Sequence, residues 1–300
     1  MINSEQLQKQ FNNDNVSFIE TDEGIVIIEI NNQFAEARIS MQGAQVLSWA
    51  PKKQKPVIWL SEDARFKKNK SIRGGIPVCW PWFGDHVETS SFPAHGFART
   101  EMWGLIYLES LSNGATVLKF KLLNEQHNNK YWPYKTSLEL EVTVSDKLDV
   151  VLKTSNFSEQ DITLTEALHT YFNVSHINNV IVNGLNDCAY LDKTQSFKLN
   201  NQDGGIQFVE ETDRVYVDTD GTVEIKDDGY NRIIRIKKSG SLSTVVWNPW
   251  QLKSDQMGDM GQDGHTHMVC VETANAATNA VVIPSGESHK LSVTYEIEAY

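Results

Sequence analysis

Strict alternation of polar and apolar residues is the feature of this chain that most restricts its fold. Residues 137–144 read Ser-Leu-Glu-Leu-Glu-Val-Thr-Val, and in residues 290–297 every second residue is again apolar. Alternation at period two buries one face of a strand and leaves the other in water, as in antiparallel sheets. The stretches 117–123, 148–154 and 232–237 are also typical of strands. The chain is therefore expected to consist mostly of strands.

Turn dipeptides separate these stretches. Asn-Gly occurs at positions 113 and 183, Gly-Gly at 204, and Asp-Gly at 220, 228 and 263. Tight turns between antiparallel strands favour such dipeptides. One short helix is expected over residues 4–12, with Ser4 as its N-cap. Many short strands without long helices predict an all-β fold, a large antiparallel β-sandwich. Because no linker is recognisable, one domain over residues 1–300 is expected.

The charge and the cysteines restrict the partners of the protein. The 300 residues carry a formal net charge of −12, whereas nucleic-acid binding requires a surplus of Lys and Arg. No apolar run approaches the ~20 residues of a membrane span, and no signal peptide is recognisable. The expectation is a cytoplasmic protein, a monomer or weak oligomer, that binds neither nucleic acid nor a membrane. The three cysteines are widely spaced and form no Cys-x-x-Cys pair, so reduced thiols are expected.

Two stretches interrupt the strand pattern. Residues 61–104 and 247–267 are rich in glycine, proline, tryptophan and histidine, and long irregular loops on a β scaffold are common places for functional sites. In the first stretch, Arg73 and Arg99 could together bind a phosphate, because a guanidinium matches its geometry with two hydrogen bonds. They could equally be surface arginines paired with acids. The neighbouring aromatic residues are expected in the core.

Two further residues are suited to acid–base chemistry. His169 follows a strand-like stretch and stands among aromatic residues, and histidine donates and accepts protons near neutral pH. Glu272 ends the apolar run 268–271, where a carboxylate is either paired with a cation or has a shifted pKa. A structural role is the alternative for both. His265 and His267 could ligate zinc, but no third ligand is recognisable, so no metal site is predicted.

Taken together, these segments identify a family. The chain resembles the aldose 1-epimerase superfamily, and within it the hexose-6-phosphate mutarotase branch. The segments that carry the resemblance occur in the expected order and span nearly the whole chain. They are Arg73-Gly74-Gly75-Ile76-Pro77, His95-Gly96-Phe97-Ala98-Arg99, Ala167-Leu168-His169-Thr170-Tyr171-Phe172, Asp213-Arg214-Val215-Tyr216, Trp247-Asn248-Pro249-Trp250 and Val271-Glu272.

The resemblance implies a fold, a reaction and a set of site residues. It implies a β-sandwich of the galactose mutarotase type that interconverts the α and β anomers of a sugar phosphate such as glucose 6-phosphate without cofactor or metal. It implies His169 as general acid and Glu272 as general base. The residues implied to bind substrate are Arg73, Arg99, His95 and Asp213. One position departs from the pattern, because some relatives have Gln before the His-Gly pair and this chain has Ala94.

The residue types suit this reaction. Mutarotation removes a proton from the C1 hydroxyl and delivers one to the ring oxygen, which a carboxylate and a histidine can do together. Two other functions remain open from sequence: a mutarotase for unphosphorylated aldoses, and a non-catalytic carbohydrate-binding β-sandwich. A glycosidase is disfavoured, because it would use two carboxylates rather than a His and a Glu.

Overall fold

Strands predominate in the computed structural model, which describes residues 3–123 and 130–300. The largest layer, here called the first sheet, has the order β13-β17-β18-β22-β9-β8-β7-β6, and all its neighbours are antiparallel. Every stretch for which strands were predicted from alternation belongs to it. Its strands are β6 (Trp103–Ser110), β7 (Thr116–Leu122), β8 (Thr136–Val144), β9 (Leu148–Asn156), β13 (Val180–Asn183), β17 (Val223–Asp227), β18 (Arg232–Ser239) and β22 (Ser288–Ala299).

The second sheet has the order β15-β14-β16-β19-β20-β11-β5, with β12 also paired to β20. Its strands are β5 (Val78–Cys79), β11 (Glu166–Leu168), β12 (Tyr171–Asn173), β14 (Ala189–Asp192), β15 (Lys198–Asn201), β16 (Thr212–Val217), β19 (Ser243–Asn248) and β20 (Met268–Asn275). All eight residues of β20 are buried. Both faces of this strand are therefore covered, so it shows no polar–apolar alternation.

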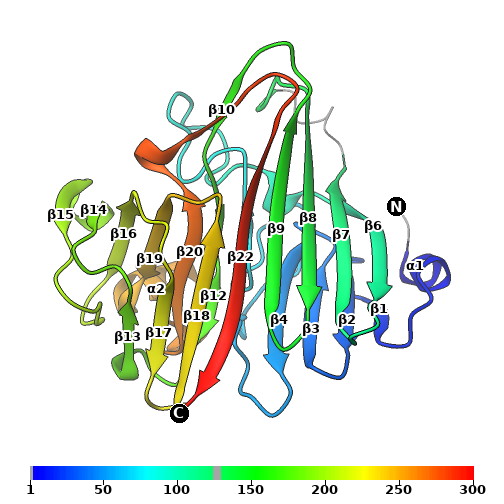
Figure 1. Cartoon of the computed structure of the whole chain (residues 1–300), viewed down its shortest axis with the longest axis horizontal. Helices are drawn as coiled ribbons and strands as arrows, with labels where there is room; N and C mark the ends of the chain where they lie inside the picture. Colours follow the sequence, from blue (N-terminus) through cyan, green and yellow to red (C-terminus); the bar gives the residue numbers. More distant parts are fainter. Residues whose placement is uncertain (1–2, 124–129) are drawn as a thin grey trace.

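The remaining strands form two smaller sheets. The third sheet has the order β1-β2-β3-β4, and β10 pairs with β21. Figure 1 shows the first sheet across the view, with the strands of the second sheet on the left and those of the third on the right. The bounds are β1 (Val16–Glu20), β2 (Val26–Asn31), β3 (Ala35–Ser40), β4 (Gln45–Pro51), β10 (Ile162–Leu164) and β21 (Val281–Ile283).

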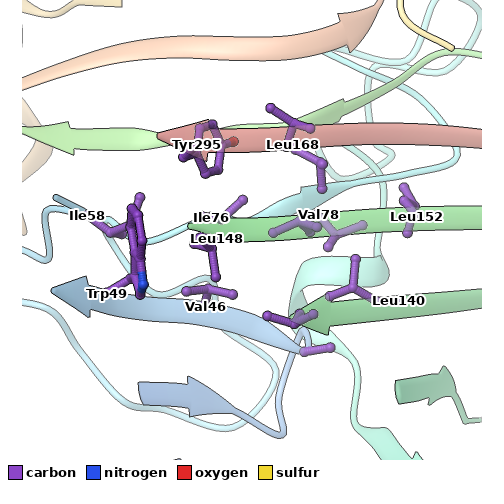
Figure 2. Close-up of a cluster of buried hydrophobic side chains, with 14 of the residues drawn as sticks. Val46, Trp49, Ile58, Ile76, Val78, Leu140, Leu148, Leu152, Leu168 and Tyr295 are labelled. Carbon is purple, nitrogen blue, oxygen red and sulfur yellow. The ribbon is translucent and has the colours of Figure 1, made fainter. Parts of the chain in front are cut away.

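The main core lies between the first sheet on one side and the second and third sheets on the other. Figure 2 shows side chains of β8, β9 and β22 meeting side chains of β4, β5 and β11. Fully buried members of this core include Leu140 and Leu152 from the first sheet and Trp49, Val78 and Leu168 from the opposite layer. This layered, antiparallel arrangement confirms the predicted large β-sandwich.

Helices are short and peripheral. α1 (Ser4–Gln10) lies within the predicted range of residues 4–12, but its N-cap is Asn3 and not Ser4. The Asn3 side chain accepts from the Gln6 N–H, and the Gln6 side chain accepts from the Asn3 N–H. The 3₁₀ turns are η1 (Ala98–Thr100), η2 (Ile177–Asn179), η3 (Lys193–Gln195), η4 (Gly264–His267) and η5 (Ala277–Asn279). Within the described residues, no helix combines the length and the apolar character that crossing a membrane requires.

The prediction of a continuous loop over residues 247–267 was wrong. This stretch contains the end of β19, the helix α2 (Trp250–Met257) and the turn η4. Only one residue of α2, Ser254, is buried, so the helix has no apolar stripe that a sequence pattern could reveal. It begins where the Asn248 side chain accepts from the Trp250 N–H, and it ends at Gly258 in the left-handed conformation.

Candidate active site

The second sheet has two faces with different surroundings. In β20, Val269 and Val271 belong to the main core, whereas Cys270 belongs to a separate cluster with Tyr171 and Trp247. We call the face that carries Cys270, directed away from the main core, the outer face. Because side chains alternate along a strand, Glu272 lies on this outer face as well. Its cross-strand partner, Val245 of β19, belongs to another cluster on the same face.

The segment that leaves β11 brings His169 to the same face. Leu168 and Phe172 point into the main core, whereas Tyr171 belongs to the outer cluster, so the alternation continues through the segment. The His169 N–H donates to the Pro77 carbonyl at 3.0 Å and holds the backbone in place. The imidazole stacks on Tyr171, with ring centroids 4.9 Å apart.

His169 and Glu272 meet on this outer face. The distance from Nε2 of His169 to Oε1 of Glu272 is 3.4 Å, and both side chains are buried, with 10% and 1% of their surface exposed. Nδ1 of His169 and Oε2 of Glu272 have no hydrogen-bond partner among the described residues. Buried polar atoms of this kind usually have a partner, so the two orphaned atoms are expected where a ligand binds.

His95 is placed beside this pair by a tight turn in which the next residue, Gly96, must be glycine. Gly96 has a φ of +69°, and an added Cβ would lie 2.0 Å from the Trp80 carbonyl oxygen. His95 itself has a φ of +65°. Its ring lies 5.6 Å from the ring of His169, and its Nδ1 accepts from the Gly84 N–H at 3.3 Å. His95 is therefore held by the backbone on both sides of a tight turn.

The two predicted arginines, Arg73 and Arg99, lie close enough to this site for their charges to affect its histidines. Nε of Arg73 donates to Asp259 at 3.0 Å, and its Nη1 donates to the Tyr171 hydroxyl at 3.1 Å. Nη2 of Arg99 donates to the Ala94 carbonyl at 2.8 Å. The charges of both arginines lower the pKa values of His95 and His169. Arg73 and Arg99 therefore lie around the histidines rather than on a distant surface.

Asp213 is brought to the site together with a residue that the sequence did not single out. Asp213 is buried on β16 and lies directly across from Trp247 of the outer cluster. Its Oδ2 is 2.9 Å from Nζ of Lys193. Lys193 is one of 27 basic residues in the chain, and no motif surrounds it. Only the pairing of distant strands could reveal it.

Burial dominates the protonation of the site. The pKa of His95 is lowered to about 3, mainly by burial and also by the charges of Arg99, Lys193 and Arg73. Burial also lowers the pKa of His169 well below its usual value, assisted by His95 and the two arginines. The pKa of Glu272 is raised well above the usual carboxyl range, mainly by burial and to a lesser extent by Asp213. These directions favour an uncharged His169–Glu272 pair that holds one proton.

Other candidate residues lie elsewhere. His265 is buried beside Trp250, whereas Nδ1 of His267 lies 3.0 Å from the Ser175 carbonyl oxygen. In the described part of the chain, no group of three or more His, Cys, Asp or Glu side chains is arranged to hold a metal ion. The aromatic residues Trp80 and Trp82 are in the core as predicted.

A comparison of the sequence with protein-family profiles identifies the family of this chain. The profile described as Aldose 1-epimerase matches residues 26–296, and the chain belongs to this family. The predicted family, the galactose mutarotase type of fold and the class of enzyme, an epimerase, are thereby confirmed.

Individual relatives agree with this assignment. A protein of Escherichia coli (strain K12) named "Putative glucose-6-phosphate 1-epimerase" is 39% identical over 264 residues, which cover 88% of this chain and 87% of the relative. A "putative mutarotase" from Salmonella typhimurium has a crystal structure with a TM-score of 0.90 and 34% identity, covering 96% of this chain and 95% of the other. A galactose mutarotase-like protein from Clostridium acetobutylicum shares the fold at a TM-score of 0.74 and 17% identity, over 95% and 98% of the two chains.

Proposed function

We propose that the protein is a hexose-6-phosphate mutarotase that interconverts the α and β anomers of glucose 6-phosphate. The observation that carries this proposal is the 3.4 Å contact between His169 and Glu272 beside Arg73 and Arg99. A proton donor and a proton acceptor are thus adjacent to cations that can bind an anionic group. The name of the Escherichia coli relative with 39% identity supports the same substrate.

Ring opening needs two proton movements. Glu272 removes the proton of the C1 hydroxyl, the C1–O5 bond breaks, and His169 delivers a proton to the ring oxygen. This step leaves an aldehyde at C1, a protonated carboxyl group and a neutral imidazole. Rotation about C1–C2 exposes the other face of the aldehyde, and reversal of both proton movements closes the ring as the opposite anomer. Neither the substrate nor the protein is oxidised or reduced in net terms, and no covalent bond to the protein forms.

Burial favours one of the two protonation states that this sequence of steps uses. The uncharged pair favoured by burial is the form that exists after ring opening. Moving its one proton from Glu272 to His169 gives the carboxylate and imidazolium with which ring opening begins. The pair therefore needs no proton from solvent during a turnover.

The remaining predicted residues fit substrate binding. Arg99 uses one of its five N–H donors on the Ala94 carbonyl, and Arg73 uses two, so the guanidinium groups retain donors for a phosphate. The ring of His95 lies 5.6 Å from that of His169, and the charges of both arginines act on it. We assign Asp213 to the sugar hydroxyls, because it is the buried carboxylate on the same face as Glu272.

The test is anomer exchange measured by NMR magnetisation transfer, with glucose 6-phosphate and glucose in parallel. We expect strong acceleration for the phosphate ester and little for glucose. Arg99→Gln should raise KM for glucose 6-phosphate about 10- to 100-fold through the loss of charged hydrogen bonds. Arg38→Gln is the matched control, because Arg38 pairs with Glu29 in the third sheet, away from the site.

The alternatives give different results. Acceleration of glucose alone would retain the acid–base chemistry and remove the phosphate site, as expected of a mutarotase for unphosphorylated aldoses. A folded protein that accelerates neither sugar would favour a carbohydrate-binding role. Equal loss in Arg99→Gln and Arg38→Gln would show that Arg99 does not bind the phosphate.

A further inference from the structure

Lys193 is a cation of the site that neither the motifs nor the family resemblance pointed to. It is the first residue of η3, directly after β14, and its Nζ lies 2.9 Å from Oδ2 of Asp213. The Lys193 side chain is 29% exposed and the Asp213 side chain 9%. The ammonium group is thus partly open to solvent, whereas the carboxylate that holds it is buried.

The strand register places Lys193 over the outer face. Leu191 of β14 packs against the second cluster on the outer face, which contains Val215 and Val245, and Lys193 follows two residues later. Asp213, its ion-pair partner, is opposite Trp247 on the same face. Lys193 therefore approaches the site from the β14 side, whereas Arg73 and Arg99 come from the segments around β5.

The positive charge of Lys193 shifts the pKa values of both Glu272 and His95. It lowers the pKa of Glu272 more than any other charge, and it lowers the pKa of His95 as well. Opposite charges favour the ionised carboxylate, so Lys193 supports the base form that ring opening requires.

The segment that carries Lys193 is held in one conformation. The buried Asp192 caps η3 by accepting from the Thr194 N–H, the Thr194 hydroxyl and the Gln195 amide. An ammonium group has three N–H donors, and Asp213 takes one of them. A fixed backbone and two further donors are suited to binding an oxyanion without much loss of conformational entropy.

We propose that Lys193 is a third phosphate-binding residue, which contacts the substrate phosphate while its ion pair with Asp213 orients that carboxylate toward the sugar. This inference rests on the proposed function, since it names a further ligand of the same substrate. It assigns Lys193 to the opposite side of the phosphate from Arg99, so that the anion is held by two separate segments of the chain, η3 and η1, rather than by one loop.

The experiment compares Lys193→Met with Lys253→Met. Lys253 is the matched control, because it also lies near Asp213 and contributes one positive charge there, but its side chain pairs with Glu211. We expect Lys193→Met to raise KM for glucose 6-phosphate about 10-fold or more through the loss of charged hydrogen bonds. KM for glucose should rise less, because glucose loses only the orientation of Asp213 and has no phosphate for Lys193 to bind. Lys253→Met should change neither, and Lys193→Arg should restore part of the affinity.

A second measurement keeps the inference separate from the proposed function. The dissociation constant of inorganic phosphate is measured by calorimetry for the wild type and both variants, with thermal melting to confirm folding. Weaker phosphate binding in Lys193→Met alone supports the inference even if the wild type catalyses no exchange, in which case only the proposed function fails. Equal phosphate affinity in both variants overturns the inference, and so does an equal loss for glucose and glucose 6-phosphate in Lys193→Met.

Discussion

The strands β11 and β20 carry two buried glutamates, one on each face of the second sheet, and each pairs with a histidine in different surroundings. On the outer face, His169 and Glu272 lie 3.4 Å apart. On the inner face, Nε2 of His289 from β22 lies 3.0 Å from Oε1 of Glu166. The residue types are the same, so the difference must come from their neighbours.

The inner pair is surrounded by groups that stabilise an ion pair. Asn275 donates to Glu166 at 3.2 Å, and its amide also contacts His289. Burial lowers the pKa of His289, but the hydrogen bond and charge of Glu166 outweigh it, so that its pKa is raised. In the outer pair, burial together with the neighbouring His95, Arg99 and Arg73 lowers the pKa of His169. Burial and nearby cations thus distinguish the pair to which we assign acid–base catalysis from the inner pair.

The largest expected effect distinguishes the two glutamates by turnover. Glu272→Gln should lower the rate of anomer exchange about 10²- to 10⁴-fold, because an amide cannot accept the C1 hydroxyl proton. The protein should remain folded. Glu166→Gln is the same chemical change on the inner face and should leave turnover of the folded protein within a few-fold. Magnetisation transfer and thermal melting of both variants measure this. A comparable loss of turnover in Glu166→Gln would break the distinction.

The next effect distinguishes the two histidines by stability. His289→Ala leaves the buried Glu166 without its cation, and breaking a buried ion pair in this way lowers the free energy of unfolding by about 3 kcal/mol. His169→Asn should cost about 1 kcal/mol, since no buried charge is left unpaired there. Urea unfolding measures both. If His169→Asn cost more than His289→Ala, the outer pair would be the structural one.

A third effect concerns the pH profile of exchange. The active pair shares one proton. Activity therefore falls at low pH, when the pair binds a second proton on His169, and at high pH, when Glu272 gives up the single shared proton. Burial and the arginines lower the pKa of His169, so the acid limb should lie below the ordinary histidine value of about 6.5. The raised pKa of Glu272 moves the basic limb upward from the usual carboxyl range. An acid limb centred at or above pH ~6.5 would contradict the uncharged pair.

Sequence patterns predicted the first sheet better than the second, for a physical reason. The strands around Leu140 and Val293 have one wet face and alternate, whereas β20 is buried on both faces and reads as an apolar run. The apolar run of β20 ends in the sequence at Glu272, but the strand itself continues to Asn275, so Glu272 lies inside the strand. One domain over residues 1–300 and the monomeric or weakly oligomeric state stay predictions.

The site residues were predicted in two different ways. Arg73, Arg99, His169 and Glu272 were proposed from their residue types and sequence surroundings, whereas His95 and Asp213 were implied only by the family resemblance. Their assembly depends on pairings between strands distant in the chain, such as Leu168 with Val78 and with Thr273. Lys193 stands in no motif, and only its ion pair with Asp213 brings it to the site. Roles for all of these residues remain proposals that the variants test.

The smallest expected effect is the pH dependence of the inner pair. His289 has a raised pKa in the folded protein, so folding takes up protons and the pair's contribution to stability is fully present below the ordinary histidine value of about 6.5. That contribution is lost as pH rises through the folded-state pKa. The difference in unfolding free energy between wild type and His289→Ala should therefore shrink as pH increases above ~6.5.

For His169, whose pKa is lowered, the sign is reversed. The buried neutral ring destabilises the folded state as pH falls below the ordinary histidine value, because the unfolded state then binds a proton that the folded state does not. The loss of stability in His169→Asn should therefore become smaller in acid. Urea unfolding of the three proteins at a series of pH values gives both slopes, and parallel slopes would mean that the charges around the two pairs do not distinguish them.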